Sequence, residues 1–230
     1  MADPFDAQPS ESLVMLGSVL RMPADKYGRR FRTTVRVIDT IHKVKATRPI
    51  DVLVSNDRDV TGRYNRHGGT GEPISIEVSK RDESMEEKLV HEIGHFLENA
   101  LIPGSAFGVR GWSSDEVTRR WRLAIKATES FQVLEELASL GTARPANREG
   151  GAARAGSSRR FLASLLTEQE LWARSYAQWV MLRGQDETLA RQIRKFRSPP
   201  SVYPLQSNHA EFEAVAAEFD SLFERIGWRI

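Results

Sequence analysis

The sequence predicts an α+β fold with a small β-sheet and a largely helical C-terminal half. Strand patterns lie within the first 80 residues, whereas helical spacing dominates from residue 84 onward. The order is a helix, two strands and then a run of helices, and no internal repeat interrupts it. Such an order is typical of an α+β domain with a helical remainder.

The first half supplies the expected sheet. Residues 10 to 22 are apolar enough for a short helix, and apolar residues recur at helical spacing from about 26 to 45. The β-branched run PIDVLVS at 49 to 55 predicts one strand, and the alternation in ISIEVS at 74 to 79 predicts a second. The segment GRYNRHGGTGEP between them predicts a loop.

Capping signals divide the second half into helices. Ser84, followed three residues later by Glu87, forms a capping-box pattern that opens a helix ending near Leu101, before Pro-Gly. Thr167 and Asn208 are expected N-caps of later helices. The remaining helices are expected at 114–140 (one long helix or two), 167–182, 186–196 and 208–226.

The length of 230 residues fits one domain with appendages. We expect an N-terminal extension at 1–25 and a single domain at 26–230, interrupted by an insert at about 141–160. That insert is rich in Gly, Ala, Ser and Arg and shows no apolar periodicity, so it predicts a flexible loop.

The basic charge of the chain is expected to come from this insert. Residues 141–160 carry five arginines and one glutamate, a net charge of +4 against +2 for the whole chain. The loop could contact RNA or phosphate, and deletion of the loop would then abolish salt-dependent DNA binding. A solvated linker is the simpler interpretation, so a nucleic-acid partner is not expected.

The sequence gives no sign of export or of a membrane span. Its longest apolar stretch, at 12–20, is too short to cross a bilayer, and acidic rather than basic residues precede it. There are no cysteines, so neither a disulfide framework nor a Cys-based zinc site is possible. We therefore expect a soluble, cytoplasmic protein without a membrane partner.

The stretch LVHEIGHFLEN at 89–99 predicts a metal site. On a helix, His91 and His95 lie about 40° apart and one turn apart, so both imidazoles can face one ion. Glu92 is rotated by about 100° from His91, and it can accept a proton from a water on the metal. Gly94 is costly inside a helix and predicts a close neighbour. The alternative is that both histidines and Glu92 are solvated surface residues.

A third metal ligand must come from elsewhere in the chain. Metzincins place a glycine and another histidine further along the same segment, but here those positions are Glu98 and Leu101. The place to look is ELWARSYAQWV at 170–180. HEIGHFLE followed, across a variable insert, by ELWARSYAQWV resembles the glutamate-zincin metallopeptidases. The similarity extends to anthrax lethal-factor-like domains and to the metallopeptidase domains of phage and mobile-element polyvalent proteins.

This resemblance implies a zincin-like fold and a zinc metallopeptidase, an endopeptidase rather than an exopeptidase. It implies that Zn²⁺ is bound by His91, His95 and Glu170, with Glu92 as general base. A peptide or protein substrate would lie along the strand at 74–79, which we expect at the sheet edge. Glu170 also fits a capping box with Thr167, in which case Glu168 is the fallback ligand.

The sequence departs from the lethal-factor pattern at one position. Those enzymes carry a tyrosine about two turns before the third ligand, where it stabilises the oxyanion, but residues 161–169 contain no tyrosine. Tyr64, His67 and Tyr176 are the candidate substitutes. Arg174, one turn after Glu170, either orients the Glu170 carboxylate or makes an exposed i,i+4 pair.

The departure keeps a second function open. A non-catalytic relative, a structural or interaction protein of a phage or mobile element, would retain the metal for stability. The remaining aromatic and histidine residues carry no expected chemistry. His42 and His209 are expected to be structural or solvent-facing, and Trp172 and Trp179 to belong to the core.

Overall fold

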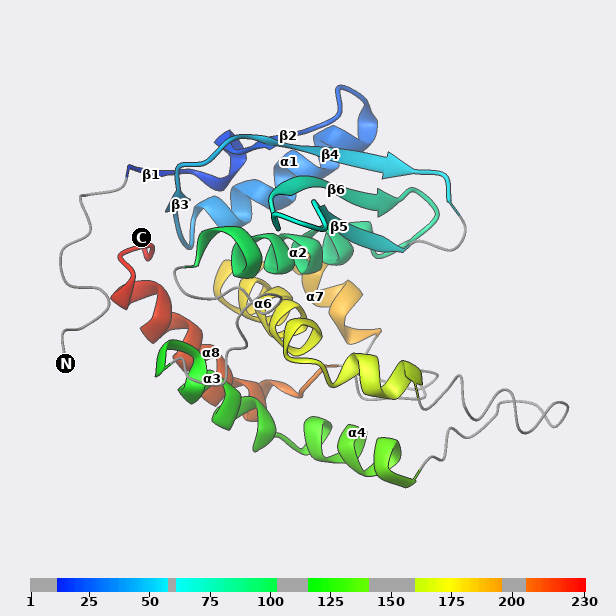
Figure 1. The fold of residues 1–230 in the computed structure, drawn as a ribbon, viewed down its shortest axis with the longest axis vertical. Helices are drawn as coiled ribbons and strands as arrows, with labels where there is room; N and C mark the ends of the chain where they lie inside the picture. The colour runs from blue at the N-terminus through cyan, green and yellow to red at the C-terminus, as the bar shows by residue number, and fades with distance from the viewer. Residues whose placement is uncertain (1–11, 58–60, 103–115, 141–159, 196–205) are drawn as a thin grey trace, which may run out of the picture.

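The computed structural model describes residues 12–57, 61–102, 116–140, 160–195 and 206–230, and it confirms the α+β class (Figure 1). Apart from Arg160, the insert expected at 141–160 lies outside the described residues. Within the described part of the chain, no helix is long and apolar enough to cross a membrane.

A four-stranded mixed sheet is the main β structure. Its strand order is β2-β4-β6-β5, in which β2, β4 and β6 are parallel and β5 is antiparallel to β6. A separate antiparallel pair joins β1 to β3. The strands are β1 (Leu13–Val14), β2 (Leu20–Arg21), β3 (Val44–Lys45), β4 (Ile50–Ser55), β5 (Gly62–Arg66) and β6 (Pro73–Ser79).

The strand expected at the sheet edge is an interior strand. β6 pairs with β4 on one side and with β5 on the other, so the edge belongs to β5. The β5 residues lie in the segment that the sequence predicted as a loop. β5 shows no apolar alternation because only Tyr64 carries a large apolar body there, and an edge strand needs little more.

The N-terminal segment also differs from expectation. The helix predicted at 10–22 is wrong, since this region forms β1, a 3₁₀ turn at Leu16–Ser18 (η1) and β2. β2 pairs with β4, and Leu16 and Leu20 are buried in the core. This part of the expected extension therefore packs with the rest of the fold.

The first two helices are capped in different ways, one by a local side chain and the other by a tertiary contact. Helix α1 (Lys26–Asp39) is capped by Asp25, whose carboxylate accepts the backbone N–H groups of Tyr27 and Gly28 at 3.0 Å. Helix α2 (Met85–Phe96) has no side-chain cap, so the predicted capping box at Ser84 is wrong. The N–H of Glu87 instead donates to Gln192 Oε1 at 2.8 Å. A π-helical turn, Leu97–Leu101, extends α2.

The helices form layers beneath the sheet (Figure 1). Helix α2 lies against β5 and β6, and α6 packs on the opposite side of α2. The region predicted as one long helix or two forms two, and α3 packs against α8. The other labelled helices are α3 (Glu116–Lys126), α4 (Glu129–Leu140), α6 (Glu168–Gly184), α7 (Glu187–Arg194) and α8 (His209–Arg225), and residues 160–165 are helical as well.

The contact between α2 and α6 depends on a glycine. A Cβ on Gly94 would lie 2.9 Å from Ala173 Cα and 3.3 Å from Tyr176 Cβ, so the helices approach where α2 has no side chain. Trp172 Nε1 donates to the Gly94 carbonyl at 3.0 Å. The prediction of a close neighbour at Gly94 is confirmed. Trp172 and Trp179 are fully buried, as expected.

Candidate metal centre

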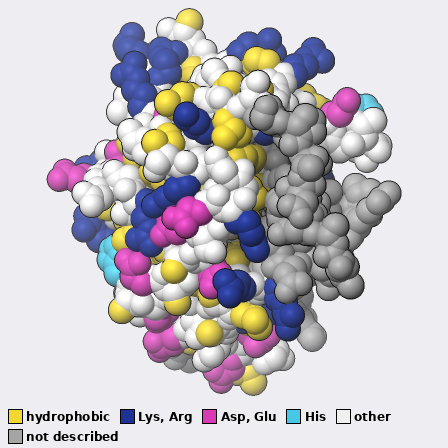
Figure 2. All heavy atoms as spheres, turned by 90° about the vertical axis from the view of Figure 1, so that its left-hand side faces the viewer, with side chains coloured by type: hydrophobic (Ala, Val, Ile, Leu, Met, Phe, Trp, Pro, Cys, Tyr) yellow, Lys and Arg dark blue, Asp and Glu magenta, His cyan; other side chains and the backbone are white. Residues whose placement is uncertain are grey.

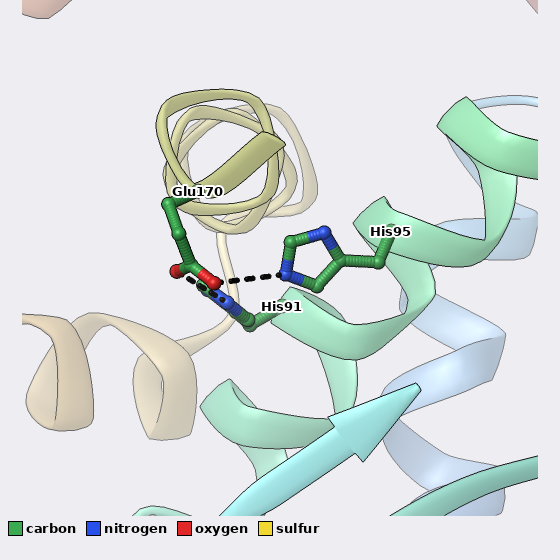
Figure 3. A group of neighbouring side chains, drawn as sticks. All are labelled: His91, His95 and Glu170. Atoms are coloured by element: carbon green, nitrogen blue, oxygen red, sulfur yellow. Dashed lines mark ion pairs between the residues drawn. The ribbon is translucent and has the colours of Figure 1, made fainter. Parts of the chain in front are cut away.

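Three side chains from two helices converge between α2 and α6 (Figure 3). His91 Nε2 lies 3.4 Å from Glu170 Oε2, and His95 Nε2 lies 3.5 Å from Glu170 Oε1. One donor atom from each residue lies within 4.8 Å of the others. The structure therefore brings together the three residues that the sequence and the resemblance named, and this group could hold a metal ion.

The spacing of these atoms tests whether an ion fits. A charge-assisted N–H···O bond is about 2.7–2.9 Å long. Ligands held about 2.0–2.1 Å from a tetrahedral ion lie about 3.3 Å from each other. The separations of 3.4 and 3.5 Å are too long for strong hydrogen bonds and match two ligands that share one ion. The geometry of the donor set thus fits a metal.

The ionisation states of two of the ligands suit this role. Burial lowers the pKa of His91, which favours the neutral imidazole that a metal requires. Burial alone would raise the pKa of Glu170, but the two imidazoles beside it bring that pKa well below its usual range. Burial opposes the charge on His95, yet the neighbouring carboxylates, Glu170 first, raise its pKa. The raised pKa of His95 means that a metal ion competes with a proton for this imidazole.

Glu92 lies beside this group but takes no part in the His91–Glu170 and His95–Glu170 contacts. Burial raises the pKa of Glu92 to about 7, and the nearby charge of Glu170 adds to the increase. A Cβ on Gly62 would lie 2.6 Å from Glu92 Oε1, so a larger residue at position 62 would shift the Glu92 carboxylate from its present place. Gly62 lies in the segment predicted as a loop, so it was not among the predicted site residues.

The N-terminal turn of α6 presents Glu170 to α2. Thr167 caps the helix, and its Oγ1 accepts the Glu170 N–H at 3.4 Å. The Glu170 carboxylate faces the histidines and does not return to the cap, so the capping-box alternative does not occupy it. Glu168, the fallback ligand, pairs with Arg122 at 3.4 Å.

Arg174 supports the backbone of this turn. Its Nε donates to the Glu170 carbonyl at 3.2 Å, and its Nη2 donates to the Leu165 carbonyl. Arg174 is buried, so it does not make the exposed i,i+4 pair that was the alternative. Its position beside Glu170 fixes the helix turn that carries the carboxylate.

Two cavities meet at the candidate centre. One, of about 740 Å³, is lined by His91 and Arg174, and the other, of about 300 Å³, is lined by His95 and Tyr64. Both are also lined by Gly62, Glu92 and Glu170. The site is therefore approachable from both sides of Glu92.

The three oxyanion candidates have different surroundings. Tyr64 lines the smaller cavity, where burial raises the pKa of its phenol and keeps it a donor. The Tyr64 hydroxyl lies 2.9 Å from the Asn99 side chain. When the Asn99 nitrogen faces Tyr64, it donates to the Tyr64 oxygen and to the Gly71 carbonyl, and the Asn99 oxygen accepts from Arg66. His67 is exposed and lines neither cavity.

Tyr176 is not at the candidate centre. It is fully buried, and its hydroxyl lies 2.8 Å from His42 Nε2. Tyr176 follows Glu170 by six residues, which on a helix is about 240° of rotation, so the two side chains leave α6 on different faces. His42 is structural, as expected, and His209 is exposed.

The chain finds no match among protein-family models, curated proteins or solved structures. The site must therefore be interpreted from its own geometry. That geometry consists of a His-His-Glu group with metal-like spacing, a second, buried carboxylate beside it, and cavities on both sides.

Proposed function

We propose that this chain is a zinc-dependent metallopeptidase of the glutamate-zincin type. The observation that carries the proposal is the spacing of the His91, His95 and Glu170 donor atoms, with Glu92 placed beside them. Two imidazoles and one carboxylate form a ligand set that zinc uses in peptidases. An HExxH helix packed beneath a small mixed sheet also supports a zincin-like fold.

In this proposal His91, His95 and Glu170 would hold the zinc ion. A bound zinc ion supplies Lewis acidity, which polarises a peptide carbonyl and lowers the pKa of water. Glu92 accepts a proton from the attacking water and later donates it to the departing amine. A pKa of about 7 suits both steps, because neither form of the carboxyl is strongly favoured near neutral pH.

An extended peptide is the proposed substrate, and it would lie along β5. No described strand pairs with the outer side of β5, so its backbone groups can accept an added strand. The two cavities on either side of Glu92 leave room for substrate residues both before and after the cleaved bond. This arrangement favours an endopeptidase over an exopeptidase.

A non-catalytic metal-binding protein is the second candidate, and one observation favours it. The hydroxyls of Tyr64 and Tyr176 both have hydrogen-bond partners, Asn99 and His42. Tyr176 lies on another face of α6, and of the two only the Tyr64 O–H can serve an oxyanion, with the Asn99 nitrogen turned to donate to the Tyr64 oxygen. A site without such a donor would keep its metal for stability and hydrolyse peptides poorly.

Zinc analysis combined with a peptide-cleavage assay tests the proposal. The purified chain should hold about one zinc ion and cleave a fluorogenic peptide pool. Glu92→Gln should keep the zinc, since Gln has the size of Glu, but should lose activity by a factor of about 10²–10⁴. Glu83→Gln is the matched control, because Glu83 lines the same cavity but is exposed and paired with Lys195.

Each outcome has a distinct meaning. A wild-type protein with full zinc and no cleavage would favour the non-catalytic alternative. Equal cleavage by wild type and Glu92→Gln would reveal a contaminating protease and would leave the peptidase proposal without support. A wild-type protein without zinc would remove both candidates.

A further inference from the structure

Charge is distributed unevenly between one segment and the rest of the chain. Residues 21–48 carry nine Lys or Arg side chains and two Asp side chains, a net charge of +7. The other 202 residues carry 24 basic and 29 acidic side chains, a net charge of −5. The largest basic excess is therefore in and around α1, and the insert at 141–160 holds the smaller one.

Helix α1 gathers part of this charge on one face. Arg29, Arg32 and Arg36 lie within about 60° of each other around the helix axis. Arg29 and Arg36 are exposed, while Arg32 and Arg36 line a cavity of about 350 Å³ between α1 and the β2 region. Asp39 also lines this cavity, where its carboxylate accepts the Gly17 N–H at 3.3 Å.

Most of these cations lack an acidic partner among the residues that the structure describes. Arg21 pairs with Asp51 at 2.8 Å, and Arg30 pairs with Glu86 at 2.7 Å. Five others form no ion pair with any described residue: Lys26, Arg29, Arg36, Lys43 and Arg48. Neighbouring described carboxylates therefore do not neutralise the positive electrostatic potential of this region.

The basic region is separate from the metal centre. Figure 2 shows Lys and Arg side chains gathered at the top of the molecule, the end that holds the sheet and α1 in Figure 1, and Asp and Glu side chains toward the bottom. The α1 cavity borders β2, at one edge of the sheet, whereas the metal centre lies beside β5, at the other edge. Both sites can be occupied together.

We propose that the α1 face, defined as Lys26, Arg29, Arg32 and Arg36, binds the phosphate backbone of a nucleic-acid duplex. Six of the nine cations in 21–48 are arginines, whose planar guanidinium matches phosphate in a bidentate geometry. This proposal revises the expectation of no nucleic-acid partner, which rested on placing the basic excess at 141–160.

The surface favours a duplex over a single strand. Single-strand binding relies on aromatic side chains that stack on bases. In residues 21–48, Phe31 and His42 are buried, and Tyr27 is half-buried with Lys26 Nζ 5.0 Å from its ring centroid. With arginines exposed and no exposed aromatic ring, binding would be to the backbone and independent of base sequence.

The test measures binding of the full chain to a labelled DNA duplex of about 20 base pairs by fluorescence anisotropy. If about four phosphates are neutralised, affinity should fall about 10²-fold between about 50 and 200 mM salt. Arg29→Glu/Arg36→Glu should weaken binding about tenfold or more and reduce the salt slope by about 2. The matched control is Arg119→Glu/Arg120→Glu on α3, which makes the same charge change at exposed positions elsewhere.

The outcomes separate the α1 face from its competitors. Binding that disappears in Arg29→Glu/Arg36→Glu, and persists in the α3 control and after deletion of 141–159, supports the proposal. Equal loss in both charge-reversal variants would indicate a net-charge effect and overturn it, as would loss only on deletion of 141–159. Tighter binding to polyglutamate, to anionic phosphatidylserine vesicles or to single-stranded DNA would also overturn it. Zinc content should be unchanged in both variants, which serves as the check on folding.

Discussion

Two buried histidine environments in this molecule look alike by burial and differ in hydrogen bonding. His42 Nδ1 donates to the Lys43 carbonyl, and its Nε2 accepts from the Tyr176 hydroxyl, both at 2.8 Å. The ring also stacks on Phe223, with centroids 4.6 Å apart. His91 Nδ1 is equally buried but has no hydrogen-bond partner among the described residues, and its Nε2 faces Glu170 at 3.4 Å.

The hydrogen-bond partners of its ring nitrogens distinguish a structural buried histidine from a candidate metal ligand. Burial lowers the pKa of both His42 and His91, so the pKa direction alone does not distinguish them. The distinguishing property is whether the ring nitrogens are satisfied. Both nitrogens of His42 have partners inside the fold, which makes it a structural residue. In His91 it is Nε2 that matters: it faces the Glu170 carboxylate at 3.4 Å, the separation expected of two ligands that share an ion.

Removing a ligand at the metal centre should have the largest effect. His91→Ala or Glu170→Ala should lose the bound zinc, with an affinity loss beyond the roughly 10–100-fold that outer partners of ligands cost. His42→Gln should retain the full zinc content, because it lies outside the centre. Elemental analysis after dialysis gives the comparison. Full zinc in Glu170→Ala would move the third ligand elsewhere, with Glu168 the first residue to examine.

The structural histidine should make the fold sensitive to acid. Burial lowers the pKa of His42 from its ordinary 6.5 to about 4. Between pH 6.5 and 4 the unfolded chain binds the proton and the folded chain does not, so stability falls as the pH falls through this window. The expected loss is about 3 kcal/mol. Above pH 6.5 the contribution of His42 is fully present.

Urea unfolding at several pH values measures this loss. The difference in unfolding free energy between wild type and His42→Gln should shrink by about 3 kcal/mol from pH 7 to pH 4, because Gln does not titrate. The reference is the same pair of proteins at pH 7 and pH 8, where the difference should stay constant. Parallel pH curves for the two proteins would show that His42 is protonated inside the fold.

The smallest effect is expected at the contact between α2 and α6, because α6 carries both Glu170 of the metal centre and Tyr176, the partner of His42. Gly94→Ala would place a Cβ 2.9 Å from Ala173 Cα, and overpacking of this kind costs about 1–3 kcal/mol. The gain in helix propensity offsets about 1 kcal/mol of that cost. Because α6 also carries Glu170, zinc affinity should fall along with stability.

A second glycine provides the comparison for that change. Nothing lies within 4 Å of a Cβ built on Gly68, so Gly68→Ala should leave both stability and zinc content unchanged. Thermal melts and zinc titration of the two variants give the contrast. A Gly94→Ala protein as stable as wild type, with unchanged zinc affinity, would show that α6 can shift without disturbing the centre.

Local patterns predicted the parts of the site that lie on one helix. His91, Glu92 and His95 follow from spacing alone, because their relation is set by the geometry of α2. Glu170 needed a resemblance, since its place depends on how α6 packs on α2. Gly62 was missed because its role depends on a neighbour 30 residues away, and β5 gave no alternation to indicate a strand.

Wrong predictions also have physical causes. Helix α6 is buried over most of its length, so no polar face showed which side Tyr176 occupies. β2 is only two residues long and is a strand because it pairs with β4, a partner that no local pattern of residues 10–22 reveals. The capping pattern at Ser84 was overridden by a tertiary partner, Gln192 of α7.

The division of the metal ligands between α2 and α6 has a consequence for engineering. If the chain were produced as two polypeptides, 1–140 and 160–230, the first would carry His91 and His95 and the second Glu170. Contacts between α2 and α6, and between α3 and α8, would favour reassembly of the halves. A complete ligand set would exist only in the reassembled pair. Metal binding would then report that the two fragments have reassembled.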